Sequence, residues 1–322
     1  MKKFLTIAIV LILSALSLVG CGKNDAGKNA YSVYVPDGAP ALAIGKLIAE
    51  NNQFDNEVTY NVVTANAIGA EILKNADVGI LPVNASSLLF SDGSRFKMVG
   101  VVTHGNLYIA SKDEITGISD LAGKTVAVAG KGNFMDLTLR LVLKNNDIAV
   151  DTDGGVKIEY YDGAPSIIPA MVQGKVSVAL LPEPAVSNAK ANAKTGITSV
   201  LDLQAIYGGG YPQAVLVMNE KALSDKTFVN AFIQALKDNE TYLNDYDNIC
   251  KAVDAINANM TSKGLTASLD KTKMTVQVVK NTNVRFAYAS EEKDAVNAYI
   301  QGLKSVDAES VKDLSDEFFY IG

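Results

Sequence analysis

The sequence predicts an α/β protein built as two Rossmann-like lobes that are joined by a two-strand hinge. Short apolar segments typical of strands alternate with amphipathic helical segments, a pattern that indicates βαβ units and a parallel sheet. The same order of elements occurs twice, and the second series starts near residue 124. A chain of 322 residues also suits two domains, at roughly 150 residues for each.

The expected elements follow one another regularly along the chain. In the first series, strands and helices alternate at 31–35, 39–51, 58–64, 67–75, 77–82 and 85–90. In the second series they alternate at 124–130, 134–146, 156–162, 164–174, 176–182 and 185–193. Beyond residue 220 the pattern becomes mainly helical, with apolar faces of period 3.6 and polar capping starts. These helices are expected at 224–243, 247–260 and 290–306, with a short strand at 284–289.

A short internal echo supports the duplication. The segments "VGILPVNASS" (78–87) and "VALLPEPAVS" (178–187) share Val, Leu, Pro and Ala at matching positions without a gap. Each runs from an apolar strand through a Pro-containing junction into a helix. In the second copy Glu183 stands between two prolines, which restrict the backbone on both sides of it. We therefore expect Glu183 to be held at the end of its strand with little conformational freedom.

Two apolar strands bracket the second series, "NLYIASK" at 106–112 and "QAVLVMN" at 213–219. We expect the chain to cross between the lobes at these two strands. The first lobe is then predicted to comprise residues 31–105 and 218–322, and the second lobe, residues 106–217, is an insertion into it. The segment "YGGGYP" (207–212), beside the second crossing, suits a hinge or a plain loop equally well.

The N-terminus predicts export and lipidation. Residues 1–20 combine a positively charged start with an apolar run shorter than the ~20 residues of a spanning helix, as signal peptides do. Cys21 follows Gly20 and begins a polar tether (21–30), so Cys21 is predicted to carry acyl chains such as palmitate. The protein would then sit at the extracytoplasmic face of a bacterial membrane; an ordinary signal peptide with an incidental Cys21 is the alternative. Cys250 then has no disulfide partner and is expected to be a small buried hydrophobe.

Charge and composition exclude several function classes. The net charge is −6, and no stripe of Arg or of basic and aromatic residues appears, which argues against nucleic-acid binding. His104 is the single histidine, so neither a His/Cys metal cluster nor a Ser-His-Asp arrangement is indicated. The segment "AGKGNFMD" (129–136) lacks the third glycine of a dinucleotide-binding loop. We therefore expect neither a metal nor a cofactor.

The junctions that follow the predicted strands are the expected binding site. In open α/β sheets ligands bind outside the carboxyl ends of the strands, where the first N–H groups of the next helix have no partners within the helix and attract oxyanions or carbonyls. Aromatic side chains suited to a small organic ligand fall at the same edge. They are Tyr160 or Tyr161, then Tyr207 and Tyr211. His104 is expected either as a hydrogen-bonding residue of this cleft or as a satisfied core residue.

The chain resembles extracytoplasmic solute-binding proteins of ABC importers. The resemblance is carried by the Gly20-Cys21 junction, the double crossing, "ALLPEPA" and the run "DLAGKTVAVAGKGNFMDLTLRLVLKNNDI". The chain is similar to the group that binds nitrate, taurine, aliphatic sulfonates and thiamine precursors and that has the type II periplasmic-binding-protein fold. The resemblance implies a ligand clamped between the lobes by loops that match Asp37, Gly38, Ala39, Thr64, Ala65, Asn66, Asn84, Ala85, Gly132, Asn133, Phe134 and Glu183.

These observations predict a monomeric binding protein that captures a small organic solute and delivers it to a membrane permease with its ATPase. The solute would be heterocyclic, aromatic or sulfonate-like, and no strongly basic motif supports nitrate. An enzyme on the same fold, of the thiamine-pyrimidine-synthase type, is the first alternative, although those enzymes are intracellular and use a histidine-bearing site. A sensor or adhesion lipoprotein without transport is the second alternative.

Overall fold

The computed structural model describes residues 28–90 and 95–322. The predicted signal peptide, Cys21 and residues 21–27 of the predicted tether lie outside the described residues. None of the helices in the described ranges is both long and apolar enough to cross a membrane.

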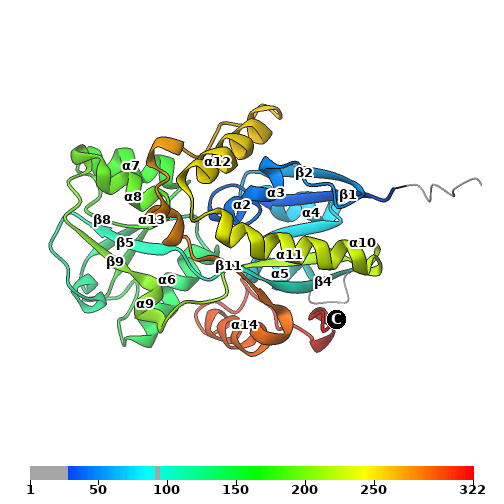
Figure 1. Cartoon of the computed structure of the whole chain (residues 1–322). Coiled ribbons are helices and arrows are strands. Elements are labelled where there is room, and N and C mark those ends of the chain that lie inside the picture. The colour runs from blue at the N-terminus through cyan, green and yellow to red at the C-terminus, as the bar shows by residue number, and fades with distance from the viewer. Residues whose placement is uncertain (1–27, 91–94) are drawn as a thin grey trace, which may run out of the picture.

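The strands form two separate mixed sheets. The first has the order β11-β4-β10-β3-β1-β2. Its strands are β1 (Ala30–Pro36), β2 (Glu57–Val63), β3 (Val78–Pro82), β4 (Phe96–Thr103), β10 (Ala214–Asn219) and β11 (Val284–Tyr288). The second sheet has the order β7-β6-β8-β5-β9. Its strands are β5 (Leu107–Ser111), β6 (Thr125–Ala129), β7 (Lys157–Tyr161), β8 (Val178–Pro182) and β9 (Ser199–Asp202). Figure 1 shows the first sheet on the right, with β1 and β2 in blue, and the second sheet in shades of green on the left.

The two sheets repeat one topology, as the internal echo predicts. In the first sheet β1 pairs with β3 in parallel, with Val33 opposite Val78. In the second sheet β6 pairs with β8 in parallel, with Val126 opposite Val178. An antiparallel strand then pairs with the other side of each echo strand, β10 with β3 and β5 with β8. The matching residues 78 and 178 therefore occupy equivalent places in the two sheets.

The sheets differ from the expected parallel arrangement at the strands beside the crossings. β10 runs antiparallel to β3 and β4, and β5 runs antiparallel to β8 and β9. These strands are antiparallel because each one enters its sheet from a crossing at the edge where the parallel strands end. β10 lies wholly in the first sheet, so the expected boundary after residue 217 falls inside one of its strands. β4 and β9 had not been expected as strands.

Helices cover both sheets, mostly where the periodicity predicts them. Those of the first series are α2 (Ala39–Leu42), α3 (Gly45–Ala49), α4 (Ile68–Asn75) and α5 (Val83–Phe90). Those of the second are α6 (Phe134–Asn145), α7 (Ala164–Val172), α8 (Ala185–Ala191) and α9 (Leu203–Tyr207). Later in the chain come α10 (Glu220–Ser224), α11 (Lys226–Tyr242), α12 (Tyr246–Thr261), α13 (Val276–Lys280) and α14 (Ala289–Lys304). Short 3₁₀ turns occur at Ile118–Leu121, Ala193–Thr195, Lys271–Lys273 and Asp316–Phe318.

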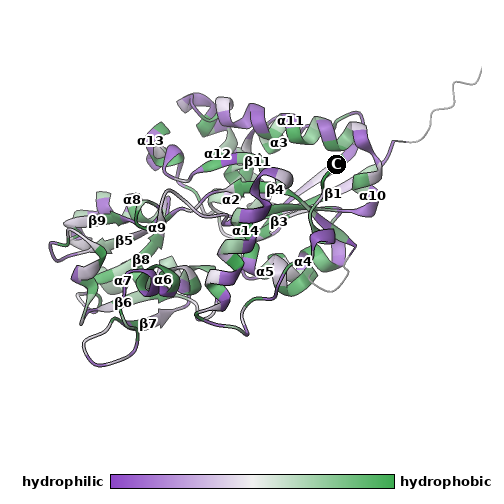
Figure 2. Ribbon diagram, turned by 90° about the horizontal axis from the view of Figure 1, so that it is seen from below, coloured by the Kyte–Doolittle hydropathy of each residue, from purple (hydrophilic) through white to green (hydrophobic). Residues whose placement is uncertain are grey.

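The single helix expected at 39–51 is two short helices, α2 and α3, with a break at Ala43 and Ile44. The close approach of α12 accounts for the position of Gly45, where an added Cβ would lie 2.9 Å from the Cβ of Ala252. Figure 2 shows apolar residues concentrated along the strands and polar residues along the outer helices.

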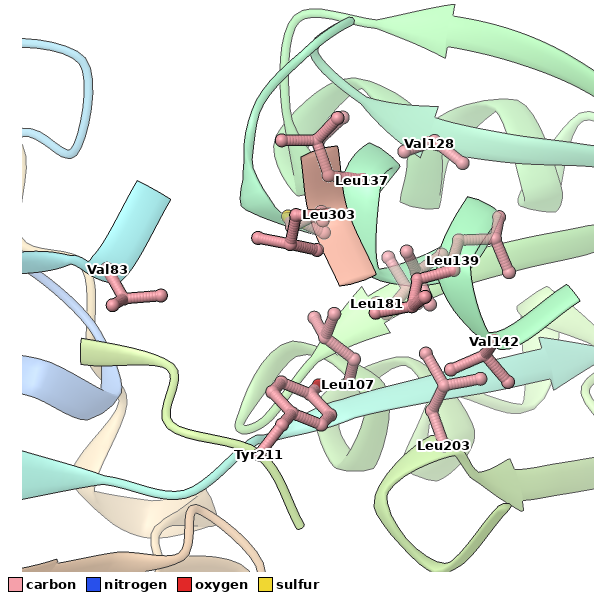
Figure 3. Close-up of a cluster of buried hydrophobic side chains, with 14 of the residues drawn as sticks. Val83, Leu107, Val128, Leu137, Leu139, Val142, Leu181, Leu203, Tyr211 and Leu303 are labelled. Carbon is pink, nitrogen blue, oxygen red and sulfur yellow. The ribbon is translucent and has the colours of Figure 1, made fainter. Parts of the chain in front are cut away.

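Helix α14 packs against both halves of the molecule, where each half is one sheet with the helices that cover it. It contacts α5 and β4 of the first half and α6 of the second. An added Cβ at Gly302 would lie 2.8 Å from Leu141 of α6, which shows how closely these two helices approach. Figure 3 shows Leu303 lying beside Leu137, between Val83 on one side and the second sheet on the other. One buried hydrophobic cluster therefore runs through both halves.

Candidate functional site

The carboxyl ends of β1 and β2 bring part of the predicted site together. The Asp37 carboxyl group lies beside the backbone N–H of Ala65 and the hydroxyl of Ser268. Burial raises the pKa of Asp37, and these hydrogen bonds partly oppose that shift. Gly38 has a φ of 84° and no atom within 4 Å of an added Cβ, while Ala39 is buried at the start of α2. Thr64, Ala65 and Asn66 are exposed.

The junction after β3 carries a buried amide without a partner. Asn84 is 5% exposed, and its Oδ1 has no hydrogen-bond partner among the described residues. The preceding residue, Val83, donates its backbone N–H to the carbonyl of Gln213 (2.9 Å). Ala85, also predicted to line the site, is half-buried. Buried polar groups in native proteins nearly always have partners, which makes the unpaired Asn84 a candidate contact for a bound molecule.

Glu183 is buried at the end of its strand, and it connects the two halves. Glu183 is 2% exposed. Its Oε1 accepts from Ser187 Oγ (2.6 Å) and from Asn281 Nδ2 (3.2 Å), and its Oε2 accepts from the backbone N–H of Ser187 (3.3 Å). Asn281 follows α13 and also accepts a hydrogen bond from Tyr108 (3.0 Å). Both Glu183 oxygens accept from protein donors, so the carboxyl group is already well satisfied.

His104 lies at the first crossing, directly after β4, and is 6% exposed. Its Nε2 lies 3.1 Å from Oε1 of Glu292 on α14, whereas its Nδ1 has no partner. Burial, followed by the charge of Arg285, lowers the pKa of His104 to about 4, although Glu292 favours the protonated form. The ring is therefore neutral at pH 7. A neutral ring that donates Nε2–H to the carboxylate presents Nδ1 as an acceptor.

The two crossings lie side by side. Gln213 donates its backbone N–H to the carbonyl of Thr103 (2.9 Å), and Tyr211 donates its own to the carbonyl of His104 (3.4 Å). Figure 3 shows the same arrangement, with Leu107 on one crossing next to Tyr211 on the other. Asn106 links the first crossing to β8, because its Nδ2 donates to the carbonyl of Glu183 (3.3 Å).

Unpaired buried polar atoms concentrate at these crossings and the strand ends next to them. Within residues 28–90 and 95–322, the buried side-chain atoms without a hydrogen-bond partner are Asn84 Oδ1, Thr103 Oγ1, His104 Nδ1, Asn106 Oδ1, Asn188 Oδ1 and Gln213 Oε1. We call these six residues the crossover site. A buried polar group without a partner costs about 1–3 kcal/mol. Five of the six lie at the crossings or at the strand ends beside them, and Asn188 lies within α8. We take this concentration of unpaired atoms as the candidate site.

The start of α6 offers fewer free N–H groups than the sequence suggested, because those of Gly132, Met135 and Asp136 donate within the protein. Asn133 caps the helix, with its Oδ1 accepting from the N–H groups of Met135 (2.9 Å) and Asp136 (3.2 Å). Gly132 donates its N–H to Asp136 Oδ2 (2.9 Å). Phe134 is half-buried and packs against the core. The residues are placed as expected, but their hydrogen bonds are largely satisfied within the protein.

The predicted aromatic residues do not gather around one ligand-sized space. Tyr161 is half-buried and donates its hydroxyl to Glu159 (2.8 Å). Tyr211 is 1% exposed, donates to Gln204 (2.9 Å) and stacks on Tyr299. Tyr207 is half-buried and packs edge-on against both Tyr211 and Tyr299. Tyr207 and Tyr211 thus belong to an aromatic cluster beneath the second crossing.

Thr103, Asn106, Asn188 and Gln213 were not singled out from the sequence. Two of them carried a signal, since Asn106 and Gln213 are the polar first residues of the otherwise apolar segments "NLYIASK" and "QAVLVMN". Elsewhere in the described ranges, no three His, Cys, Asp or Glu side chains lie together as metal ligands would. Cys250 on α12 is half-buried with a free thiol, so it is less buried than expected.

Comparison with known proteins places the chain in a family. A family model described as "NMT1/THI5 like" matches residues 58–245, more than half of the chain. None of the curated proteins matches the sequence.

Solved structures share the fold at low sequence identity. An ABC transporter protein from Parabacteroides distasonis is 21% identical with a TM-score of 0.70, and the match covers 91% of this chain and 99% of that one. The alkanesulfonate-binding protein SsuA from Xanthomonas axonopodis pv. citri, bound to MOPS, is 14% identical with a TM-score of 0.64, covering 92% and 99%. The aliphatic sulphonate binding protein SsuA from Escherichia coli is 14% identical with a TM-score of 0.62, covering 92% and 95%.

Proposed function

Since the chain belongs to the NMT1/THI5-like family, we propose that it is the substrate-binding component of an ABC importer. It captures a small organic solute between its two halves and delivers it to a membrane permease. The proposal places the chain at the extracytoplasmic membrane face, anchored through Cys21, with the permease and ATPase as partners. Its fold is shared with ABC-type solute-binding proteins, which supports this assignment.

The crossover site is the observation that carries the proposal. Its unpaired atoms come from both halves, with Asn84 and Gln213 beside the first sheet and Asn106 and Asn188 beside the second. A solute held by these residues would be bound where the two halves meet. Binding there favours one relative orientation of the halves, which is the property that a permease can recognise.

Thermal unfolding of the full-length chain with small organic solutes tests binding. A ligand at about 100 Kd is expected to add about 2.7 kcal/mol to the free energy of unfolding. The bound solute should be recovered chemically unchanged, because a binding protein does not convert it. Conversion of the solute would instead support the enzyme alternative, and the absence of any stabilising solute would contradict the proposal.

Uptake by cells separates an importer component from a sensor. Cells that lack this chain are expected to lose uptake of the stabilising solute at low external concentration, and expression of the chain should restore it. Unchanged uptake in such cells would support the sensor or adhesion alternative.

A further inference from the structure

The hydrogen-bonding direction of two crossover-site residues is set by their partners. The Nε2 of His104 faces the carboxylate of Glu292, which can only accept, so Nε2 carries the proton. Because the ring is neutral, the unpaired Nδ1 is then a hydrogen-bond acceptor. The Nδ2 of Asn106 donates to the backbone carbonyl of Glu183, which leaves Oδ1 as the unpaired atom. Both atoms require a partner that donates a hydrogen bond.

The charges around the crossover site have the sign that suits a donor. The carboxyl group of Glu292 lies one hydrogen bond from His104, and Glu183, whose backbone carbonyl accepts from Asn106, carries a second buried carboxyl group nearby. Among the described residues, no Lys or Arg is buried. Arg285 lies 4.0 Å from Glu292, but its side chain is 52% exposed. A buried anion needs compensating positive charge, and here the buried surroundings do not provide it.

At three of the helix starts beside the strand ends, N–H groups already donate to oxygens of the protein. At the start of α8, the N–H of Ser187 donates to Glu183, a carboxylate. At the start of α6, Asn133 and Asp136 supply the acceptors, and at the start of α5 the N–H of Val83 donates to the Gln213 carbonyl. At α5, α6 and α8, N–H groups of the kind that bind oxyanions in many α/β proteins are thus bonded within the protein.

We propose that the crossover site takes a small neutral or cationic solute that presents N–H donors, such as an amine, amidine or amide compound, and that it rejects organic anions such as sulfonates. This inference rests on the proposed function, because it assumes that the crossover site is where the solute binds. Glu292 is a positioning residue in this scheme, since it fixes the His104 tautomer and need not touch the solute.

The tautomer can be measured without knowing the solute. His104 is the single histidine of the chain, so the imidazole ¹⁵N signals of the ¹⁵N-histidine-labelled full-length protein belong to this ring alone. At pH 7 we expect a protonated Nε2 and an unprotonated Nδ1. In Glu292→Gln, whose amide can donate, the fraction with a protonated Nδ1 should rise, whereas Asp294→Asn on the same helix should leave the spectrum unchanged. A protonated Nδ1 in the unaltered protein would overturn the inference.

Skeleton-matched compounds test the preference directly. Benzamidine and benzamide are compared with benzenesulfonate and benzoate, and ethylamine and acetamide with ethanesulfonate and acetate, by thermal unfolding and by the Nδ1 signal. The compounds with N–H donors (benzamidine, benzamide, ethylamine and acetamide) are expected to raise the melting temperature and shift the Nδ1 signal. Glu292→Gln should weaken their binding at least tenfold. Stabilisation by the sulfonates or carboxylates instead would overturn the inference while leaving the proposed function standing. If no compound of either kind binds, both are contradicted.

Discussion

Thr103 and Thr282 form a matched pair of fully buried threonines. The hydroxyl of Thr103 has no partner among the described residues, whereas that of Thr282 donates to the carbonyl of Val279 (2.6 Å). Replacing a hydroxyl by a methyl group removes a desolvation cost in the first case and a hydrogen bond in the second. The same substitution should therefore have opposite effects at the two positions.

We predict that Thr103→Val raises the free energy of unfolding of the solute-free protein by about 1 kcal/mol, whereas Thr282→Val lowers it by about 1 kcal/mol. Urea unfolding followed by circular dichroism measures both values. Equal destabilisation by the two substitutions would show that Thr103 is satisfied inside the protein and is not part of a binding site.

His104 makes stability depend on pH. Its pKa is lowered from 6.5 to about 4 in the folded state, so on acidification the unfolded state binds the proton first. The contribution to stability is present above pH 6.5 and is lost as the pH falls towards 4.

Relative to His104→Gln, we expect the unaltered protein to lose about 3 kcal/mol of stability between pH 7 and pH 4, from a shift of about 2.5 pKa units. Urea unfolding at several pH values gives the difference between the two proteins, in which the titration of the carboxyl groups cancels. Parallel pH profiles would contradict the buried, neutral state of the ring.

At the scale of elements, the start of α6 illustrates a junction that the sequence located correctly but could not interpret. Asn133 is the N-cap, and both of its side-chain atoms are engaged within the protein, Oδ1 by Met135 and Asp136 and Nδ2 by Ala129. Whether Asp136 turns back to Gly132 is a matter of side-chain conformation. The sequence therefore predicted the helix start, but not that N–H groups at this start are hydrogen-bonded within the protein.

Asn133→Ala is expected to lower the free energy of unfolding by about 1 kcal/mol, the usual cost of losing an N-cap, and Asn133→Asp should retain most of the stability. Solute affinity should change less than twofold in both variants, as measured by calorimetry. A large loss of affinity with unchanged stability would restore the ligand-binding role expected from the sequence.

The strands show why some elements can be predicted and others cannot. The echo at 78–87 and 178–187 was correctly interpreted because identical residues at one offset have the same inward pattern in both sheets. β4 was missed because "FKMVGVVT" is an apolar run without alternation, and periodicity alone does not assign such runs. The crossover site depends on which polar side chains lose both water and partners, a property of the packed protein. Asn106 and Gln213 therefore looked like ordinary strand starts.

The whole molecule is joined by more than the predicted two-strand hinge. Helix α14 contributes to the hydrophobic cluster shared by both halves, and Tyr299 hydrogen-bonds Thr138 of α6. Asn281, following α13, bonds both Glu183 and Tyr108 of the second half. A closing motion of the two halves would have to keep α14 packed against both of them, or break the hydrogen bonds of Asn281 to Glu183 and Tyr108 and form others. In the proposed function, such a motion would act on a solute held at the crossover site.

Calorimetric titration of a stabilising solute into the unaltered protein and into Thr103→Val measures whether the crossings hold the solute. We expect Thr103→Val to bind the solute about tenfold more weakly, because one hydrogen bond of about 1.4 kcal/mol is lost, although the variant is the more stable protein without solute. Thr282→Val, which is less stable, should bind with unchanged affinity. Unchanged affinity in Thr103→Val, or weaker binding in Thr282→Val alone, would contradict a solute site at the crossings.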